Sequence, residues 1–203
     1  MPKQLSMGSE SGFVLPTRYP RGILGNMKEI VQDGTPVLRD IAQPVPEEMF
    51  GTPELAHIIE DMKTALDPEI EGVALAAPQI DVPYRIFIVR KDRTVTPPPL
   101  EEGAEQPMPV PEHDIYINPE IIKTSRKRAK VDEGCLSVRG IYGTTSRHER
   151  VSIRARALDG KKFERGGGGL MAQIFEHEID HLNGILFIDH AEHLVEIIHE
   201  PAE

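Results

Sequence analysis

The chain has 203 residues, a net charge of −10 and one cysteine, and these numbers exclude several protein classes. The length suits one domain with a sizeable core plus additions. A single cysteine excludes an internal disulfide framework and fits a reducing cytoplasm. The negative charge argues against direct nucleic-acid binding. No stretch approaches the roughly 20 apolar residues needed to cross a bilayer, so we expect a cytoplasmic protein that does not enter membranes.

The first 26 residues contain glycine, serine and proline without apolar periodicity. They lack the continuous apolar core of a secretory signal. Arginines are few and no amphipathic pattern appears, which argues against organellar targeting but leaves it open. We predict a flexible extension over residues 1–26, unless Met27 is the true start, and a domain from residue 27 to 190.

The first expected helix covers residues 53–66. Thr52 is a typical N-cap, and Pro53 suits the first helical position. The apolar residues that follow recur at helical spacing and form one stripe that we expect to face the core. These residues are Leu55, Ile58, Ile59, Met62, Ala65 and Leu66.

Three strands and one long insertion are expected in the middle of the chain. Tyr84 to Val89 reads as a strand, and residues 92–113 that follow contain six prolines, five acids and one arginine. That composition predicts an irregular insertion exposed to solvent. Asp114 to Asn118 and Val151 to Leu158 are also expected to be strands, and Asp159-Gly160 favours a hairpin turn after the latter.

A second helix is expected over Leu170 to Leu182. The glycine run 166–169 before it is not a phosphate loop, because no Lys-Ser/Thr pair follows. Apolar residues lie around much of the helix, which predicts that it is buried. We therefore expect an α+β fold with small β-sheets packed around this helix. Residues 191–203 are expected to form an acidic tail, with a helix as one alternative.

The second helix carries His177-Glu178-Ile179-Asp180-His181, an HExxH pattern. Histidines four positions apart project from one face of a helix, where they can hold one transition metal. Glu178 lies on the flank of that face, and a buried helix gives the metal a rigid platform. A catalytic metal also needs a third protein ligand and an open position for water.

The third ligand must come from elsewhere in the chain. One large class of zinc proteases continues to a third histidine after Gly184, but Phe187 occupies that place here. Glu196 and Glu200 could act as they do in a second class, yet they lie in the acidic tail with no other sign of a site. Two histidines and a thiolate are a known catalytic set, and a thiolate also suits iron. The predicted metal ligands are Cys135, His177 and His181.

Simpler interpretations of the same residues exist. HExxH occurs by chance on exposed helices, and a lone cysteine is more often a small buried hydrophobe than a ligand. A purely structural metal site would usually contain several cysteines, and here there is one.

Three ordered segments make the metal site specific. Gly72 to Gln79 reads G-V-A-L-A-A-P-Q, Glu133 to Ser137 reads E-G-C-L-S, and His177 to His181 reads H-E-I-D-H. In this order they resemble the motifs of the peptide deformylases. The similarity runs from about Met27 to about Asp189, and three ordered motifs are far more specific than any one of them.

The resemblance implies a metal-dependent hydrolase that removes the formyl group from the N-terminal formyl-methionine of newly made proteins. Ferrous iron is the implied native metal, with zinc, nickel or cobalt able to replace it. Glu178 is implied as general base and acid for hydroxide generated at the metal. Gln79 and the backbone N–H of Leu136 would hold the developing oxyanion. The residues implied to contact the substrate are Gly72, Val73, Ala74, Gly134, Leu170 and Gln173.

The chain departs from the family pattern at several positions. Ala74 replaces a glycine where the family backbone approaches the peptide, and Gln173 and Glu176 replace residues on the upstream turns of the metal-binding helix. Some deformylases are thought to dock on the ribosome through a basic C-terminal helix. Residues 191–203 contain four glutamates and no lysine or arginine, which argues against that docking mode.

Two rival functions can be stated against the deformylase hypothesis. An HExxH endopeptidase would cleave internal peptide bonds and would tolerate Cys135→Ser. A non-catalytic metal-binding relic is the other, but Glu178 argues against it, since a relic needs no base beside an open coordination position.

Overall fold

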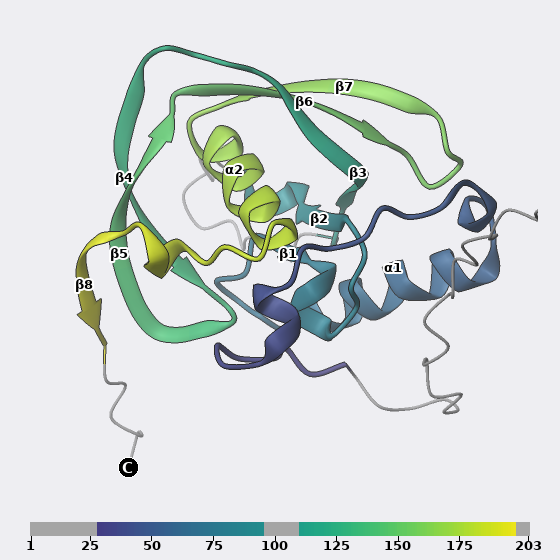
Figure 1. Cartoon of the computed structure of the whole chain (residues 1–203), viewed down its shortest axis with the longest axis horizontal. Helices are drawn as coiled ribbons and strands as arrows, with labels where there is room; N and C mark the ends of the chain where they lie inside the picture. Colours follow the sequence, from purple (N-terminus) through teal and green to yellow (C-terminus); the bar gives the residue numbers. More distant parts are fainter. Residues whose placement is uncertain (1–27, 96–109, 198–203) are drawn as a thin grey trace, which may run out of the picture.

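The computed structural model describes residues 28–95 and 110–197. Two antiparallel sheets account for the strands (Figure 1), with the orders β1-β2-β3-β6-β7 and β4-β5-β8. The strands are β1 (Ala74–Ala76), β2 (Ile86–Arg90), β3 (His113–Thr124), β4 (Arg128–Cys135), β5 (Val138–His148), β6 (Arg150–Arg156), β7 (Lys162–Gly168) and β8 (Glu192–Glu196). The helices are α1 (Pro53–Leu66) and α2 (Leu170–Leu182), with short 3-10 turns η1 (Pro36–Arg39), η2 (Glu47–Met49), η3 (Ala77–Ile80), η4 (Lys91–Arg93) and η5 (Phe187–Asp189).

Helix α1 forms over the residues that the sequence predicts. The hydroxyl oxygen of Thr52 accepts a hydrogen bond from the backbone N–H of Leu55 at 3.3 Å, which satisfies one of the free donors at the helix start. Pro53 occupies the first turn, where its missing N–H costs nothing. All six residues of the predicted apolar stripe are buried.

Strand β2 separates two hydrophobic layers because its side chains alternate between the faces of the sheet. Ile86 and Ile88 belong to the core cluster that α1 completes. Phe87 and Val89 belong to the cluster on the other face, where α2 packs. The five-stranded sheet therefore has one helix on each face, and α2 lies between it and the three-stranded sheet (Figure 1).

An aromatic cluster fixes α2 on the five-stranded sheet. The rings of Phe87 and Tyr116 are stacked with centroids 4.6 Å apart. Phe175 of α2 meets the Tyr116 ring edge-on at 5.5 Å. Such aromatic contacts add to the energy of burial, so the helix has a defined position relative to β2 and β3.

Two glycines define the ends of α2. Gly169 precedes the helix with φ 55° and ψ −127°, a conformation that L side chains rarely adopt. Gly184 follows it with φ 73°, and a Cβ there would lie 2.5 Å from the backbone oxygen of Arg39. The helix therefore begins and ends at fixed points, which places its histidines precisely enough to share one ion.

The expected α+β class and the buried second helix are confirmed. The three expected strands and the turn at Asp159-Gly160 are present, with β3 extending to Thr124. Of the glycine run, which was given no secondary structure, residues 166–168 lie in β7 and pair with β6, and Gly169 precedes α2.

The tail and the insertion are described in part. Glu192–Glu196 of the acidic tail form the edge strand β8 instead of a helix. Of the expected insertion, residues 92–95 and 110–113 are described, and 96–109 lie outside the described residues, as do 1–27. No helix among the described residues is long and apolar enough to span a membrane.

Candidate metal centre and active site

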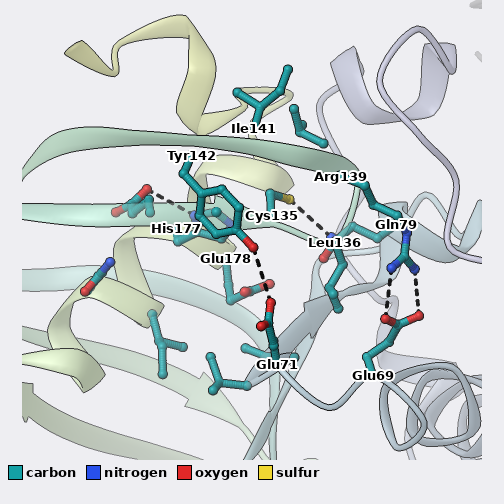
Figure 2. A pocket seen from close by; sticks show the side chains of 18 of the residues that line it. Glu69, Glu71, Gln79, Cys135, Leu136, Arg139, Ile141, Tyr142, His177 and Glu178 are labelled. Atoms are coloured by element: carbon teal, nitrogen blue, oxygen red, sulfur yellow. Dashed lines mark hydrogen bonds and ion pairs between the residues drawn. The ribbon is translucent and has the colours of Figure 1, made fainter. Parts of the chain in front are cut away.

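The three predicted metal ligands meet at the junction of two elements that are distant in sequence. Cys135 is the last residue of β4, and His177 and His181 lie on successive turns of α2. The β4–β5 hairpin brings the cysteine over the face of the helix that carries the two histidines (Figure 2). The cysteine sulfur lies 3.2 Å from Nε2 of His181. The ligand atoms of all three residues lie within 4.8 Å of one another, so one ion could contact all of them.

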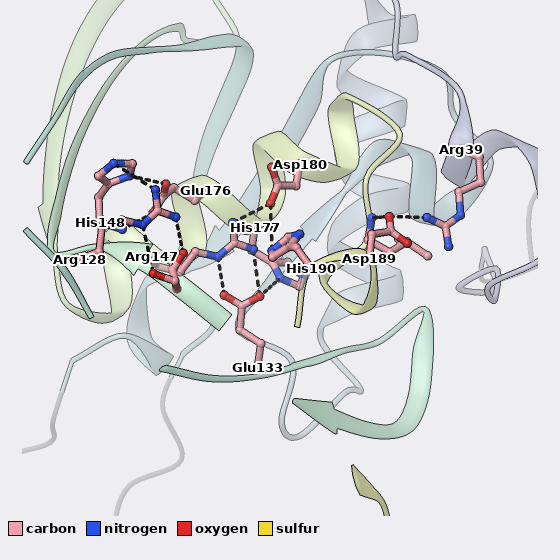
Figure 3. Close-up of polar contacts among 12 residues, drawn as sticks. Arg39, Arg128, Glu133, Arg147, His148, Glu176, His177, Asp180, Asp189 and His190 are labelled. Atoms are coloured by element: carbon pink, nitrogen blue, oxygen red, sulfur yellow. Dashed lines mark hydrogen bonds and ion pairs between the residues drawn. The ribbon is translucent and has the colours of Figure 1, made fainter. Parts of the chain in front are cut away.

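A buried carboxylate orients the first histidine from behind. Oε2 of Glu133 lies 3.2 Å from Nδ1 of His177, which leaves Nε2 for a metal (Figure 3). Such a partner on the remote ring nitrogen fixes the orientation of a metal-binding imidazole. Glu133 was not assigned a role from sequence, although it belongs to the motif that contains Cys135.

Arg147 of β5 holds Glu133 in place. Its guanidinium donates to both carboxylate oxygens at 2.7 and 3.0 Å and also contacts Asp180 of α2 at 2.6 Å. Burial alone would raise the pKa of Glu133, but the hydrogen bonds from His177 and Arg147 outweigh it and hold the pKa well below its usual range. The carboxylate is therefore ionised behind the metal ligand. No sequence signal indicated Arg147, because its contact depends on the pairing of β4 with β5.

The second histidine has the protonation state that a metal requires. Burial lowers the pKa of His181 well below its ordinary value, so its imidazole is neutral. Metals bind the neutral imidazole, and a thiolate with two imidazoles is a known catalytic ligand set. Within residues 28–95 and 110–197, Nδ1 of His181 has no hydrogen-bond partner, and its Nε2 faces the cysteine sulfur. The residues present thus fit a transition metal.

The carboxylate of Glu178 lies beside the cluster and is shielded from solvent. The side chain is buried, and its Oε2 atom finds no hydrogen-bond partner in the described part of the chain. Burial raises the pKa of Glu178 to about 7. An acid with that pKa can both take and return a proton near neutral pH.

The amide of Gln79 reaches the cluster from the other wall. Its oxygen accepts a hydrogen bond from the N–H of Ala76 at 2.8 Å, which directs the NH₂ group toward Cys135 and Ser137. Nε2 lies 3.6 Å from the cysteine sulfur and 3.1 Å from the serine hydroxyl oxygen. A buried amide donor thus points at the predicted metal site.

A pocket of about 690 Å³ opens over these residues (Figure 2). Its size lies in the range of small-ligand sites. Leu136 lines it, as do Gln79 and Glu178. The pocket also brings together all six residues expected to contact the substrate, namely Gly72, Val73, Ala74, Gly134, Leu170 and Gln173.

Of the three positions that depart from the family pattern, Ala74 and Gln173 line this pocket and Glu176 does not. Ala74 begins β1 and is buried, with 8% of its surface exposed. Nε2 of Gln173 donates to the backbone oxygen of Asp132 at 2.8 Å, which ties α2 to β4 at the pocket wall. Glu176 faces away from the pocket and binds the N–H and ring of His148, each at 2.7 Å (Figure 3).

Two polar pairs on the pocket wall were not foreseen from sequence. Arg139 donates to both carboxylate oxygens of Glu69, at 3.0 and 2.6 Å. The hydroxyl of Tyr142 donates to Oε2 of Glu71 at 3.2 Å. No motif contains these residues, and only the fold brings their two segments together.

Comparison with known proteins gives one consistent result. The family model for polypeptide deformylase matches residues 27–196. The chain is 39% identical over 178 residues to a peptide deformylase of Latilactobacillus sakei, which covers 81% of this chain and 89% of that protein. It is 35% identical over 164 residues to the chloroplastic peptide deformylase 1A of Solanum lycopersicum, covering 80% of this chain and 59% of that protein.

Solved structures agree. The class I type b peptide deformylase of Acinetobacter baumannii with bound Met-Ala-Ser matches with a TM-score of 0.67 and 31% identity, over 81% of this chain and 99% of that chain. From its motifs, its fold and these relatives, the chain belongs to the peptide deformylase family, whose members remove the N-terminal formyl group from newly made proteins.

Proposed function

We propose that this chain is a metal-dependent deformylase of formyl-methionyl peptides and that Cys135, His177 and His181 hold its metal. The observation that carries the proposal is the convergence of their three ligand atoms within 4.8 Å, from β4 and from α2. The pocket above them and the buried Glu178 beside them supply space for a substrate and a proton carrier.

Ferrous iron is the proposed native metal, with zinc, nickel or cobalt as substitutes in a purified sample. A thiolate beside two imidazoles accepts all four of these ions, so the ligand set does not by itself select one. When bound, a divalent cation makes water a usable nucleophile at neutral pH and polarises a carbonyl oxygen.

Glu178 is proposed to move the proton. Its buried carboxylate would take the proton of the attacking water and return it to the amine that leaves as the formamide breaks. The raised pKa supports this double role, because a carboxyl near neutrality gains and loses a proton at similar cost.

Gln79 and the N–H of Leu136 are proposed to stabilise the oxyanion that develops on the formyl oxygen. Gln79 is buried and oriented by Ala76, so it needs no reorganisation when charge appears. Leu136 directly follows the proposed ligand Cys135 in the sequence, and it lines the same pocket.

The substrate peptide is proposed to lie between two strand edges. β1 ends the five-stranded sheet and β4 ends the three-stranded sheet, and residues at both line the pocket. An extended peptide can bind such edges through backbone hydrogen bonds. Gly72, Val73, Ala74 and Gly134 would contact its backbone, and Leu170 and Gln173 would border its first side chain. The bound Met-Ala-Ser of the Acinetobacter relative supports a peptide of this kind.

The test measures formate release from two peptides, using protein that has been prepared in the absence of oxygen. Formate should be released from formyl-Met-Ala-Ser and not from acetyl-Met-Ala-Ser. Glu178→Ala should keep the metal and lose at least about 100-fold in kcat, the usual contribution of a general base. Cys135→Ser should lose the metal, whereas an endopeptidase of the HExxH type would tolerate that change. Normal turnover by Glu178→Ala would overturn the assigned role.

The domain limits, the cellular compartment and the relation to the ribosome are also inferred. Residues 27–190 would form the catalytic domain, between the extension 1–26 and the acidic tail 191–203, and the insertion at 92–113 would interrupt it. The family match begins at residue 27, which supports the first of these limits, and it ends at residue 196, inside the proposed tail. We place the protein in the cytoplasm, with organellar targeting as the alternative that a chloroplastic relative keeps open. Any ribosome association would be transient, without direct nucleic-acid binding.

A further inference from the structure

Tyr142 and Glu71 connect the two walls of the pocket. Tyr142 lies on β5 directly opposite Gly134 of β4, and its side chain crosses in front of the metal ligands toward the segment that precedes β1 (Figure 2). There its hydroxyl donates to Oε2 of Glu71 at 3.2 Å. Both residues line the pocket, so a bound peptide can lie beside them.

The position of Tyr142 is fixed by close packing on Gly134. A Cβ on that glycine would lie 2.7 Å from Cε1 of the tyrosine ring, so the ring rests on bare backbone. With the ring held, its hydroxyl also holds Glu71, an otherwise exposed glutamate, at the pocket wall. A charge that is held in place before binding acts on a ligand without an ordering cost.

The hydrogen-bond partner of Glu71 is a neutral hydroxyl, so it does not compensate a carboxylate charge. Among the described pocket residues, Glu69 is neutralised by Arg139 through both carboxylate oxygens. Glu71 receives only the tyrosine hydroxyl, and no ion pair joins it to any cation in the described part of the chain.

A second uncompensated carboxylate lies on the opposite wall. Asp132 of β4 is exposed and accepts the hydroxyl of Thr144 at 3.0 Å, which again leaves its charge in place. Arg139 is the one lysine or arginine among the described residues that line the pocket, and it is already paired. The route into the pocket is therefore flanked by negative charge on both sides.

Given the deformylase function proposed above, we propose that Glu71 is a specificity-determining residue that favours substrates with lysine or arginine directly after the formyl-methionine. A cationic side chain leaving the pocket between the two walls would pair with Glu71, with Asp132 adding to the attraction. A glutamate or aspartate at the same place would be repelled by both.

The expected discrimination is modest because the pair is exposed. Exposed ion pairs change affinity by factors of up to about five, and attraction of one substrate combines with repulsion of the other. We therefore expect kcat/KM to differ about tenfold between lysine and glutamate substrates at low salt. Added salt should reduce this ratio, because the Debye length falls to about 3 Å at 1 M.

The experiment measures kcat/KM for formyl-Met-Lys-Ala-Ala, formyl-Met-Gln-Ala-Ala and formyl-Met-Glu-Ala-Ala with the metal-loaded protein, so that only the residue directly after the formyl-methionine changes. The variants are Glu71→Gln, which removes the charge, and Glu71→Lys, which reverses it. Glu48→Gln is the matched control, because Glu48 is an exposed glutamate in η2 outside the pocket. The lysine-to-glutamate ratio should fall to about threefold or less in Glu71→Gln, drop below one in Glu71→Lys and keep its full value in Glu48→Gln.

A wild-type lysine-to-glutamate ratio near one, or a ratio that Glu71→Gln leaves unchanged, would overturn the inference. Formate release from the glutamine peptide would still uphold the deformylase function in that case. If the wild-type protein released formate from none of the three peptides, the proposed function would fail and this inference would fail with it.

Discussion

Glu133 and Arg147 form a buried, two-pronged ion pair directly behind His177, a proposed metal ligand, with oxygen–nitrogen distances of 2.7 and 3.0 Å. Both side chains are at most 6% exposed. Because the same carboxylate also contacts Nδ1 of His177, the orientation of this imidazole depends on the Glu133–Arg147 pair.

Replacing Glu133 with glutamine should weaken metal binding about 10- to 100-fold, the usual effect of losing such an orienting partner. The amide keeps the shape but lacks the charge that binds both His177 and Arg147. Competition with a chelator for Zn²⁺ measures the affinity. Glu176→Gln is the control, because this buried glutamate binds His148, which is not a ligand. Equal affinities in both variants would contradict the orienting role.

The ion pair between Asp92 and Arg90 should make stability depend on pH in the acid range. Hydrogen bonds from Arg90 lower the pKa of Asp92 from 3.8 to about 2. A lowered folded-state pKa stabilises the protein fully above pH 3.8, and this contribution is lost as the pH falls through about 2. Asp92→Asn should therefore reduce the free energy of unfolding by about 1–2 kcal/mol at pH 6 and by little at pH 2.

Urea titrations of the wild type and Asp92→Asn across pH 2 to 6 would show whether the gap between them closes in acid. Asp159→Asn offers a comparison, since Asp159 pairs with Lys161 on the surface and should change stability much less. A gap that stays constant across this range would refute the linkage.

Gly184→Ala should destabilise the protein by about 2 kcal/mol or more, because φ is positive there and the new methyl group meets the backbone oxygen of Arg39 at 2.5 Å. Thermal unfolding of the metal-free protein would detect the loss. Gly166→Ala is the matched control, as its methyl group would meet only the Ser152 hydroxyl at 3.6 Å. Similar melting temperatures for the two variants would contradict the steric argument.

Phe175→Ala should cost about 3–5 kcal/mol in the free energy of unfolding, as for other buried aromatic residues. The ring is fully buried between Phe87 and Tyr116 and fixes α2 on the sheet. Phe163→Ala removes a half-buried ring at the other side of Tyr116 and should cost less. Chemical denaturation compares the two, and an equal loss would show that burial does not decide the cost.

Local sequence signals predicted the elements whose cause is local. Thr52, Pro53 and an apolar stripe were enough to define α1. Three ordered motifs were enough to predict that Cys135 and the two histidines share one site, because their functional residues make chemical sense only in a common site.

Features that depend on strand pairing were not predicted. β4 and β5 contain mostly polar residues, and neither strand was expected from the sequence. The Arg147–Glu133 pair depends on their register, and the Tyr142–Glu71 contact depends on how that hairpin faces the segment before β1. β7 contains glycines that disfavour a strand, yet its pairing with β6 overrides that local preference.

The ligands of the proposed site come from a hairpin and a helix that are 46 residues apart along the chain, counted from Cys135 to His181. An ion shared between them is therefore also a cross-link, comparable in its topology to a disulfide that the single cysteine cannot form. At a free metal concentration of 100 times Kd it would add about 2.7 kcal/mol to the folded state by mass action. Loss of the cation would thus remove catalysis and loosen the β4–β5 hairpin from α2 in the same event.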